Sequence, residues 1–175
     1  MNNLYLCGFI GYDKNDIANK VAKILGYRVL NLDCFIQKQT TMNTRTILKE
    51  YGETCLREIE REAFQKVAAM DQVVVVVTQT TFALEENIVL AKQTGKVVYL
   101  HYPYKTYYRK MKASNYRGME AQVDEQECMA RYNKIHTLFK IAASDTFDLT
   151  YCPQLQAKEI ACLLQHHSLH ERKDA

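Results

Sequence analysis

The stretch LYLCGFIGYDKND, residues 4–16, decides the fold because it joins two kinds of periodicity within a few residues. Leu4 to Ile10 form an apolar run that stops at Gly11, as expected for a buried strand. The residues that follow have apolar side chains at helical spacing, at Ile17, Val21, Ile24 and Leu25. A strand, a short loop with glycine and lysine, and then a helix are typical of a loop that binds phosphate.

This loop only partly matches the phosphate-loop pattern, G-x-x-x-x-G-K-[ST]. Gly8, Gly11 and Lys14 fit, but Asp13 replaces the second required glycine and Asn15 replaces the hydroxyl residue. A carboxylate about 4 Å from a phosphate costs on the order of 4 kcal/mol at an effective dielectric near 20. That energy weakens nucleotide binding by roughly a thousandfold. Asp13 is also a good helix N-cap, so we expect it to occupy the donors that phosphate needs.

The remainder of the chain alternates strands and helices, which predicts a parallel sheet covered on both faces. Further strands are expected at 28–32, 73–77, 96–102 and 146–149. Further helices are expected at 44–70 with a break near 51–53, and at 85–92, 106–112, 125–139 and 155–165. The fold class is therefore α/β, a single three-layer domain over residues 1–165 with a five-stranded parallel sheet. Residues 166–175 are expected to form a disordered tail.

Composition excludes several classes of protein. The 175 residues are 47% hydrophobic and 25% charged with a net charge of +3, typical of a globular domain and too weakly basic for a nucleic-acid binder. The longest apolar run, Val73 to Val77, cannot span a membrane, and the N-terminus lacks the pattern of a signal peptide. We therefore expect a cytoplasmic protein. The six dispersed cysteines include no CxxC pair, which favours free, mostly buried thiols over a zinc site or a disulfide framework.

Several stretches together resemble the shikimate kinase family along nearly the whole chain. They are LYLCGFIG, KVAKILGYRVLNLDCFIQKQT, ILKEYGETCLREIEREAF, GKVVYL, YYRKMK with YRGM, and TLFKIAASDTFD. The resemblance implies a P-loop kinase fold with a lid at about residues 113–124. It also implies a phosphotransferase that passes the ATP γ-phosphate to the 3-hydroxyl of shikimate with Mg²⁺ as cofactor.

The resemblance also assigns roles to residues after the second strand and on the next helix. The family has Asp-x-Asp where this chain has Asn31-Leu32-Asp33, so Asn31, with Asn15, is at most a weak Mg²⁺ ligand. Asp33 becomes a substrate-hydroxyl acceptor and candidate base, although it could equally cap the helix that starts at Cys34. Arg57 matches the arginine that binds the shikimate carboxylate, whereas composition alone indicates a solvated helix arginine.

The other implied substrate and nucleotide contacts are altered in part. A glycine-rich turn is replaced by Thr78-Gln79-Thr80-Thr81, so Gln79, Thr80 and Thr81 would line the substrate site and fill space there. In the lid, Arg117 is a candidate to stabilise the transferring phosphate, although an exposed loop arginine would look the same. Arg109 aligns with an arginine near adenine. Ile135 stands where a second carboxylate-binding arginine belongs, and Arg131 could replace that arginine only if the helix shifts by one turn.

Three hypotheses follow. The first is a degenerate homologue that has lost or greatly weakened ATP-Mg²⁺ transfer but still binds a small anionic metabolite through Lys14, Asp33, Arg57 and Arg117, in a regulatory role. The second is an active kinase acting on shikimate or an altered substrate. The third is a nucleic-acid-binding module, based on the tyrosines and basic residues of HYPYKTYYRKMKASNYRG (101–118), and we favour the kinase lid over it. His166, His167 and His170 could bind a metal, but a disordered terminus is the simpler interpretation.

Overall fold

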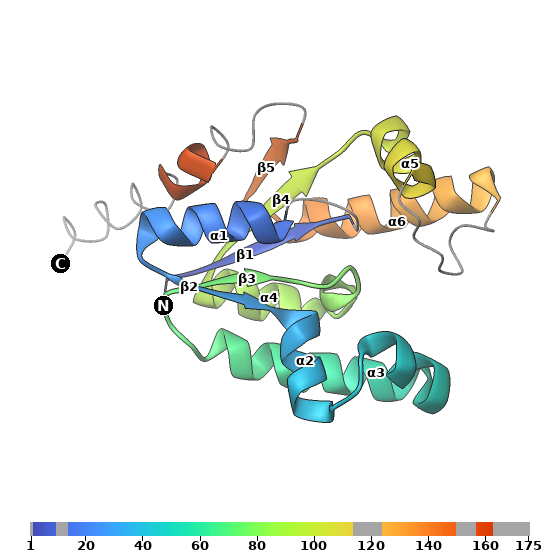
Figure 1. Cartoon of the computed structure of the whole chain (residues 1–175), viewed down its shortest axis with the longest axis horizontal. Helices are drawn as coiled ribbons and strands as arrows, with labels where there is room; N and C mark the ends of the chain where they lie inside the picture. Colours follow the sequence, from blue (N-terminus) through green and yellow to red (C-terminus); the bar gives the residue numbers. More distant parts are fainter. Residues whose placement is uncertain (1, 10–13, 114–123, 150–156, 163–175) are drawn as a thin grey trace.

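The fold is built on one sheet of five parallel strands in the order β2-β3-β1-β4-β5 (Figure 1). The computed structural model describes residues 2–9, 14–113, 124–149 and 157–162. The strands are β1 (Asn3–Gly8), β2 (Arg28–Asn31), β3 (Val73–Val76), β4 (Gly95–His101) and β5 (Asp145–Asp148). The predicted fold class is confirmed.

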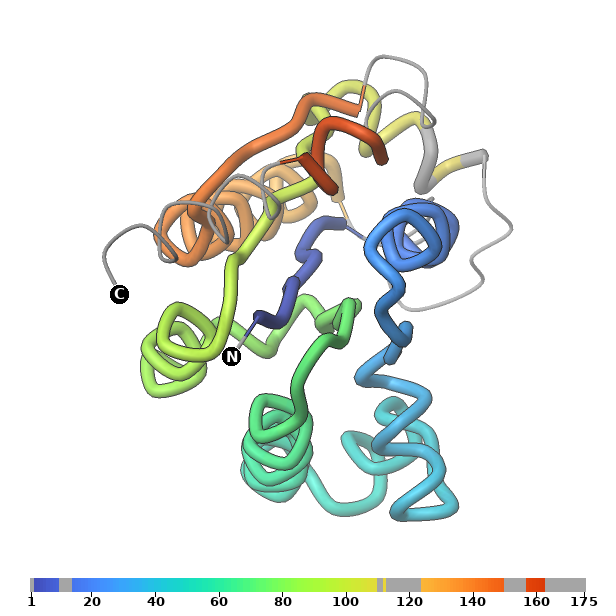
Figure 2. The backbone as a smooth tube through the Cα atoms, turned by 90° about the vertical axis from the view of Figure 1, so that its left-hand side faces the viewer, coloured from blue at the N-terminus to red at the C-terminus, as the bar shows by residue number. Residues whose placement is uncertain are grey.

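Helices cover both faces of this sheet (Figure 2). They are α1 (Lys14–Leu25), α2 (Leu32–Thr40), α3 (Thr44–Ala68), η1 (Thr81–Ala83), α4 (Glu85–Thr94), α5 (Tyr104–Ala113) and α6 (Glu125–Ala142). Residues 157–162 are also helical. The residues of α1 and 157–162 pack on one face, whereas α3, α4 and α6 pack on the other.

The central strands are buried on both faces, as their continuous apolar runs predict. Alternate residues of β1 enter opposite halves of the core: Tyr5 and Cys7 join the cluster beneath α3, α4 and α6, and Leu4 and Leu6 join the cluster beneath α1. All four residues of β3 are buried. This rigid layer brings the carboxyl ends of β1, β2 and β3 to one edge, where open α/β sheets bind ligands.

The boundaries of the helices and strands differ from the sequence predictions by a few residues. The predicted break in the long helix is observed. The helix after the first loop begins at Lys14 rather than Ile17, and β1 ends at Gly8. The expected interruption of the long helix is confirmed at Gly52, whose φ of 83° is left-handed and suits glycine. Within the described part of the chain, no helix combines the length and apolar character that crossing a bilayer requires.

Among the cysteines the structure describes, all five are free thiols, as expected, but their burial is mixed. Cys7 and Cys128 are buried, Cys55 is half-buried, and Cys34 and Cys162 are exposed. The expectation of mostly buried thiols was therefore wrong for the exposed pair. The lid core (114–123), the tail (163–175) and Cys152 lie outside the described residues.

Candidate functional site

The candidate site is at the carboxyl ends of β1, β2 and β3, where α1 and α2 begin (Figure 1). Gly8 closes β1 and Lys14 opens α1. Gly8 must be small, because a Cβ there would lie 2.7 Å from the backbone oxygen of Leu100. The predictions for Gly11 and Asp13 fall on residues outside the described part of the chain.

Lys14 turns its ammonium group back onto the ends of two strands. Its Nζ donates hydrogen bonds to the backbone oxygens of Gly8 at 2.9 Å and Val77 at 3.3 Å. Burial lowers the pKa of Lys14, and the nearby Cys7 and Asp33 act in the opposite direction. The lysine is thus a partly desolvated cation between β1 and β3, a position suited to an anionic ligand.

The two residues expected at the metal position bind each other. Asn31 Nδ2 donates to Asn15 Oδ1 at 2.9 Å. Asn31 Oδ1 accepts the backbone N–H of Cys34 at 3.1 Å, which caps α2. Each side-chain oxygen therefore already accepts one hydrogen bond, and neither residue has a charge.

Asp33 lies inside the first turn of α2 and does not cap it. The alternative interpretation of Asp33 as a helix cap was wrong, because Asn31, two residues earlier, is the N-cap of α2. Asp33 Oδ1 instead accepts a hydrogen bond from Thr44 Oγ1 at 3.3 Å on the exposed surface. Its carboxylate is thus directed between α2 and the start of α3.

The turn after β3 is filled by hydroxyl groups arranged around a buried carboxylate. Glu60 is only 2% exposed, and its Oε1 accepts from Thr78 Oγ1 at 3.0 Å and from Thr80 Oγ1 at 2.6 Å. Thr78 and Thr81 each accept the other's backbone N–H through their Oγ1 atoms at 3.0 Å. Burial raises the pKa of Glu60, the two threonine hydrogen bonds lower it, and Asp33 adds a smaller increase. The expectation that side chains fill this turn agrees with this network.

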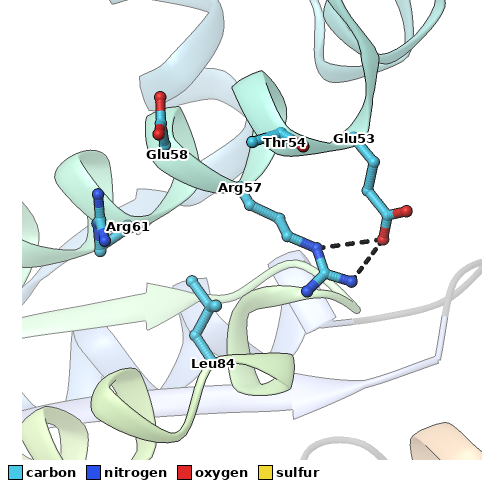
Figure 3. Close-up of a pocket in the computed structure, with 6 residues that line it drawn as sticks. All are labelled: Glu53, Thr54, Arg57, Glu58, Arg61 and Leu84. Atoms are coloured by element: carbon cyan, nitrogen blue, oxygen red, sulfur yellow. Dashed lines mark hydrogen bonds and ion pairs between the residues drawn. The ribbon is translucent and has the colours of Figure 1, made fainter.

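Arg57 lines a pocket of about 250 Å³ between α3 and the start of α4 (Figure 3). Its guanidinium donates to Glu53 Oε1 from Nε at 3.1 Å and from Nη2 at 2.5 Å. Arg61 reaches across to Glu86 on α4, with Nη1 3.8 Å from Oε1. Thr54, Glu58 and Leu84 complete the lining. Glu53 therefore already pairs with Arg57, the arginine that is expected to bind the carboxylate of a ligand.

Comparisons of sequence and of structure identify relatives of this chain. A family model described as shikimate kinase matches residues 11–161. The chain belongs to the shikimate kinase family. The shikimate kinase of Nostoc punctiforme is 31% identical over 128 residues, which cover 70% of this chain and 67% of that protein. That of Persephonella marina is 29% identical over 119 residues, 68% of this chain and 73% of that protein.

Solved structures agree on the fold. Shikimate kinase from Acinetobacter baumannii in complex with shikimate superposes with a TM-score of 0.84 at 23% identity, covering 97% of this chain and 96% of that one. Shikimate kinase from Aquifex aeolicus superposes with a TM-score of 0.83 at 21% identity, covering 95% of this chain and 98% of that one. At these identities the match shows the fold alone.

Other residues implied by the family lie on the opposite half of the sheet from Arg57. Arg109 on α5 and Arg131 on α6 are both exposed, on helices near β4 and β5, whereas α3 lies beside β2 and β3 (Figure 1). Ile135 packs against the apolar core, which agrees with the expected loss of an arginine there. Gln79 is half-buried, and its Nε2 is buried without a hydrogen-bond partner. Arg117 lies outside the described residues.

Glu60 is the site residue that the sequence analysis missed. It falls on the buried face of α3 together with Leu56, Ala63, Phe64 and Val67. A carboxylate at helical spacing within an apolar stripe was the available signal, because such a group needs buried partners. Its hydroxyl partners come from a turn 18 and 20 residues away.

The described residues do not fit the Mg²⁺ that the family uses. Magnesium sites in proteins are built on one or two carboxylates, and here both positions carry amides whose oxygens accept other hydrogen bonds. Among the residues that the structure describes, no three of His, Cys, Asp and Glu form a group able to hold a metal ion. The mismatch with Mg²⁺ concerns Asn15 and Asn31. The neighbouring Lys14 and Asp33 are the residues that the family resemblance implies.

Proposed function

We propose that this member of the shikimate kinase family catalyses ATP-dependent phosphorylation of shikimate weakly or not at all, and that its site binds a small anionic metabolite. The observation that carries the proposal is the hydrogen bond from Asn31 Nδ2 to Asn15 Oδ1 at 2.9 Å. It joins the two positions from which the family supports its metal ion.

The amide pair opposes metal-assisted transfer in two ways. Mg²⁺ gives up its water shell reluctantly and is held through carboxylates, and a neutral pair supplies no charge to offset that cost. Each amide oxygen would also have to share its electron density between the metal and a hydrogen bond that it already accepts, Asn15 Oδ1 from Asn31 and Asn31 Oδ1 from Cys34. The negative charge on the transferring phosphoryl group would then lack a large part of the neutralisation that a metal ion supplies.

The threonine turn supports the proposal independently. The hydroxyls of Thr78 and Thr80 already donate to Glu60, and Thr81 Oγ1 is bonded within the same turn. A ligand bearing several hydroxyl groups would meet side chains that are already satisfied. Binding it there would require the network to open, at a cost comparable to its hydrogen bonds.

A site for an anion is still present. Lys14 places a partly desolvated ammonium between the ends of β1 and β3, and Arg57 lines the pocket between α3 and the start of α4. The exposed Arg57–Glu53 pair is of a type worth only about 0.3–0.5 kcal/mol, so a ligand carboxylate could replace Glu53 at little cost. These two cations favour a small carboxylate or phosphate.

A second candidate is an active kinase for shikimate or a related small molecule. It is favoured by the curated relatives, which are named shikimate kinase, and by the presence of Lys14 and Asp33 at their family positions. This candidate requires Asn15 and Asn31 to hold Mg²⁺ through water. It predicts strong binding of ATP with Mg²⁺, which the first proposal does not.

Thermal melting with ligands separates the two candidates. The protein is melted with ATP, ADP, Mg²⁺ and shikimate, alone and combined. A nucleotide present at 100 times its dissociation constant stabilises a fold by about 2.7 kcal/mol. We expect no such shift with ATP and Mg²⁺ for this chain, and a clear shift for the triple variant Asp13→Gly, Asn15→Ser, Asn31→Asp. A full shift in the unmodified protein would overturn the proposal.

A further inference from the structure

A cluster of two histidines, two tyrosines and an aspartate lies where β4 and β5 end against α6. It consists of Tyr99 and His101 on β4, Asp148 on β5, and Tyr132 and His136 on α6. His101 and Asp148 are register partners across the two strands. The rings of His101 and His136 are 5.0 Å apart between centroids.

Both ring nitrogens of His101 face hydrogen-bond acceptors. Tyr132 Oη donates to the backbone oxygen of Tyr102 at 2.5 Å, and that carbonyl can only accept. At its 3.2 Å contact with His101 Nε2, the tyrosine oxygen must therefore accept. On the other side, His101 Nδ1 contacts the carboxylate of Asp148, which also accepts. Both ring nitrogens thus face acceptors, so the two hydrogen bonds form together only when His101 carries both ring protons.

The neighbouring histidine has the opposite role. His136 Nδ1 is 2.9 Å from Tyr99 Oη. Burial raises the pKa of Tyr99, so this tyrosine keeps its proton and donates it to the ring nitrogen. Burial lowers the pKa of His136, and the charges of His101 and Lys140 lower it further. The cluster thus pairs a histidine between two acceptors with a histidine whose surroundings favour the neutral ring.

Tyr132 connects this cluster to the phosphate loop. Its ring stacks on the ring of His136, with the centroids 5.7 Å apart and an interplanar angle of 8°. It also stacks on the ring of Phe9, with the centroids 4.5 Å apart and an interplanar angle of 14°. Phe9 follows Gly8 directly and is the last described residue before positions 10–13. Tyr132 and Phe9 are 5% and 2% exposed, so neither ring can shift without disturbing the other.

We propose that His101 is a proton-dependent clamp whose imidazolium holds Tyr132 in place, and that Tyr132 in turn holds Phe9 at the start of the phosphate loop. When His101 loses a proton to solvent, it can donate to Asp148 or to Tyr132 but not to both. The clamp is therefore complete at acidic pH and loosens as pH rises. The titratable or charged groups around it are Asp148, Tyr99, Tyr132 and His136, with Lys140 behind His136.

His101 is a positioning residue in this account, and its role does not depend on whether the protein transfers phosphate. Loss of one charge-assisted hydrogen bond increases the equilibrium constant for local opening by about tenfold or more. We expect the amide of Phe9 to exchange about tenfold faster at pH near 8.5 than near 5.5, beyond the intrinsic effect of pH on exchange.

The test uses the full chain in solution. Nitrogen-15 NMR of the His101 ring reads its protons directly, and amide exchange of Phe9 is followed over the same pH range. We expect two protonated ring nitrogens at the acidic end of this range, and we expect His101→Gln and Asp148→Asn each to remove the extra pH dependence at Phe9. Asp145→Asn, on the same strand, is the matched control and should retain it.

Two results would overturn the clamp. One is a His101 ring with an unprotonated nitrogen throughout this range. The other is Phe9 exchange with the same pH dependence in Asp148→Asn as in the unmodified protein. Asp148→Asn alters an exposed side chain, so the test stands even if His101→Gln does not fold.

Discussion

Replacing Asn31 by aspartate tests the amide pair at the metal position. The new carboxylate still accepts the N–H of Cys34, so the cap of α2 is kept. It loses the 2.9 Å bond to Asn15 and faces the amide oxygen instead. Loss of one exposed neutral hydrogen bond costs about 1 kcal/mol, partly offset by about 0.3–1 kcal/mol from a negative charge at a helix N-terminus.

We therefore expect Asn31→Asp to unfold at a slightly lower temperature than the unmodified protein in the absence of metal. A change of 1 kcal/mol corresponds to about 2–4 °C for a domain of this size. Mg²⁺ should reverse the loss, because a carboxylate and an amide oxygen then converge on one point. At 100 times its dissociation constant the metal adds about 2.7 kcal/mol. The unmodified protein should not respond.

Calorimetric melting with EDTA and with Mg²⁺ measures both effects. Asn43→Asp is the matched control, since Asn43 caps α3 by accepting the N–H of Thr46 at 2.8 Å and lies at another helix start. It should melt alike with and without Mg²⁺. Equal stabilisation of the unmodified protein and Asn31→Asp by Mg²⁺ would refute the reasoning, because the amides would then suffice as ligands.

Two further predictions concern Glu60 and Gly8. Burial raises the pKa of Glu60 above its usual value of 4.5, so the folded state takes up this proton more readily than the unfolded state. The free energy of unfolding of the unmodified protein should therefore rise relative to Glu60→Gln as pH falls from neutrality toward about 4.5. Urea titrations at several pH values measure this, with exposed Glu62→Gln as control; a constant difference would contradict it. Gly8→Ala should lose about 1–3 kcal/mol in the same assay, because its Cβ would lie 2.7 Å from the oxygen of Leu100, and an unchanged midpoint would show that β4 yields freely.

Much of the fold follows from the sequence, because its strongest signals are local. The apolar run at Val73 predicts a strand buried on both faces, and Gly52 predicts a break in a long helix; both are observed. Boundaries are less predictable where one residue serves two elements. Asn31 is paired with Val76 as the last residue of β2 and also caps α2, so the cap falls earlier than Asp33.

The site is less predictable, because its contacts join residues that are distant in the chain. The i,i+4 spacing of Glu53 and Arg57 is enough to suggest their ion pair. The bonds between Asn31 and Asn15 and between Glu60 and Thr80 depend on how the strands align the loops, which no local pattern specifies. Substituted positions in a motif thus indicate where to look, and the fold determines which side chains satisfy one another.

The most direct measurement of the central claim is the rate of ADP formation from ATP, Mg²⁺ and shikimate by the purified, folded protein. We predict a rate at or only slightly above that without shikimate, and much faster shikimate-dependent ADP formation when Asp13→Gly, Asn15→Ser and Asn31→Asp are combined. Shikimate-dependent turnover by the unmodified chain as fast as that of the triple variant would contradict the claim that the amide pair at Asn15 and Asn31 impairs metal-assisted transfer.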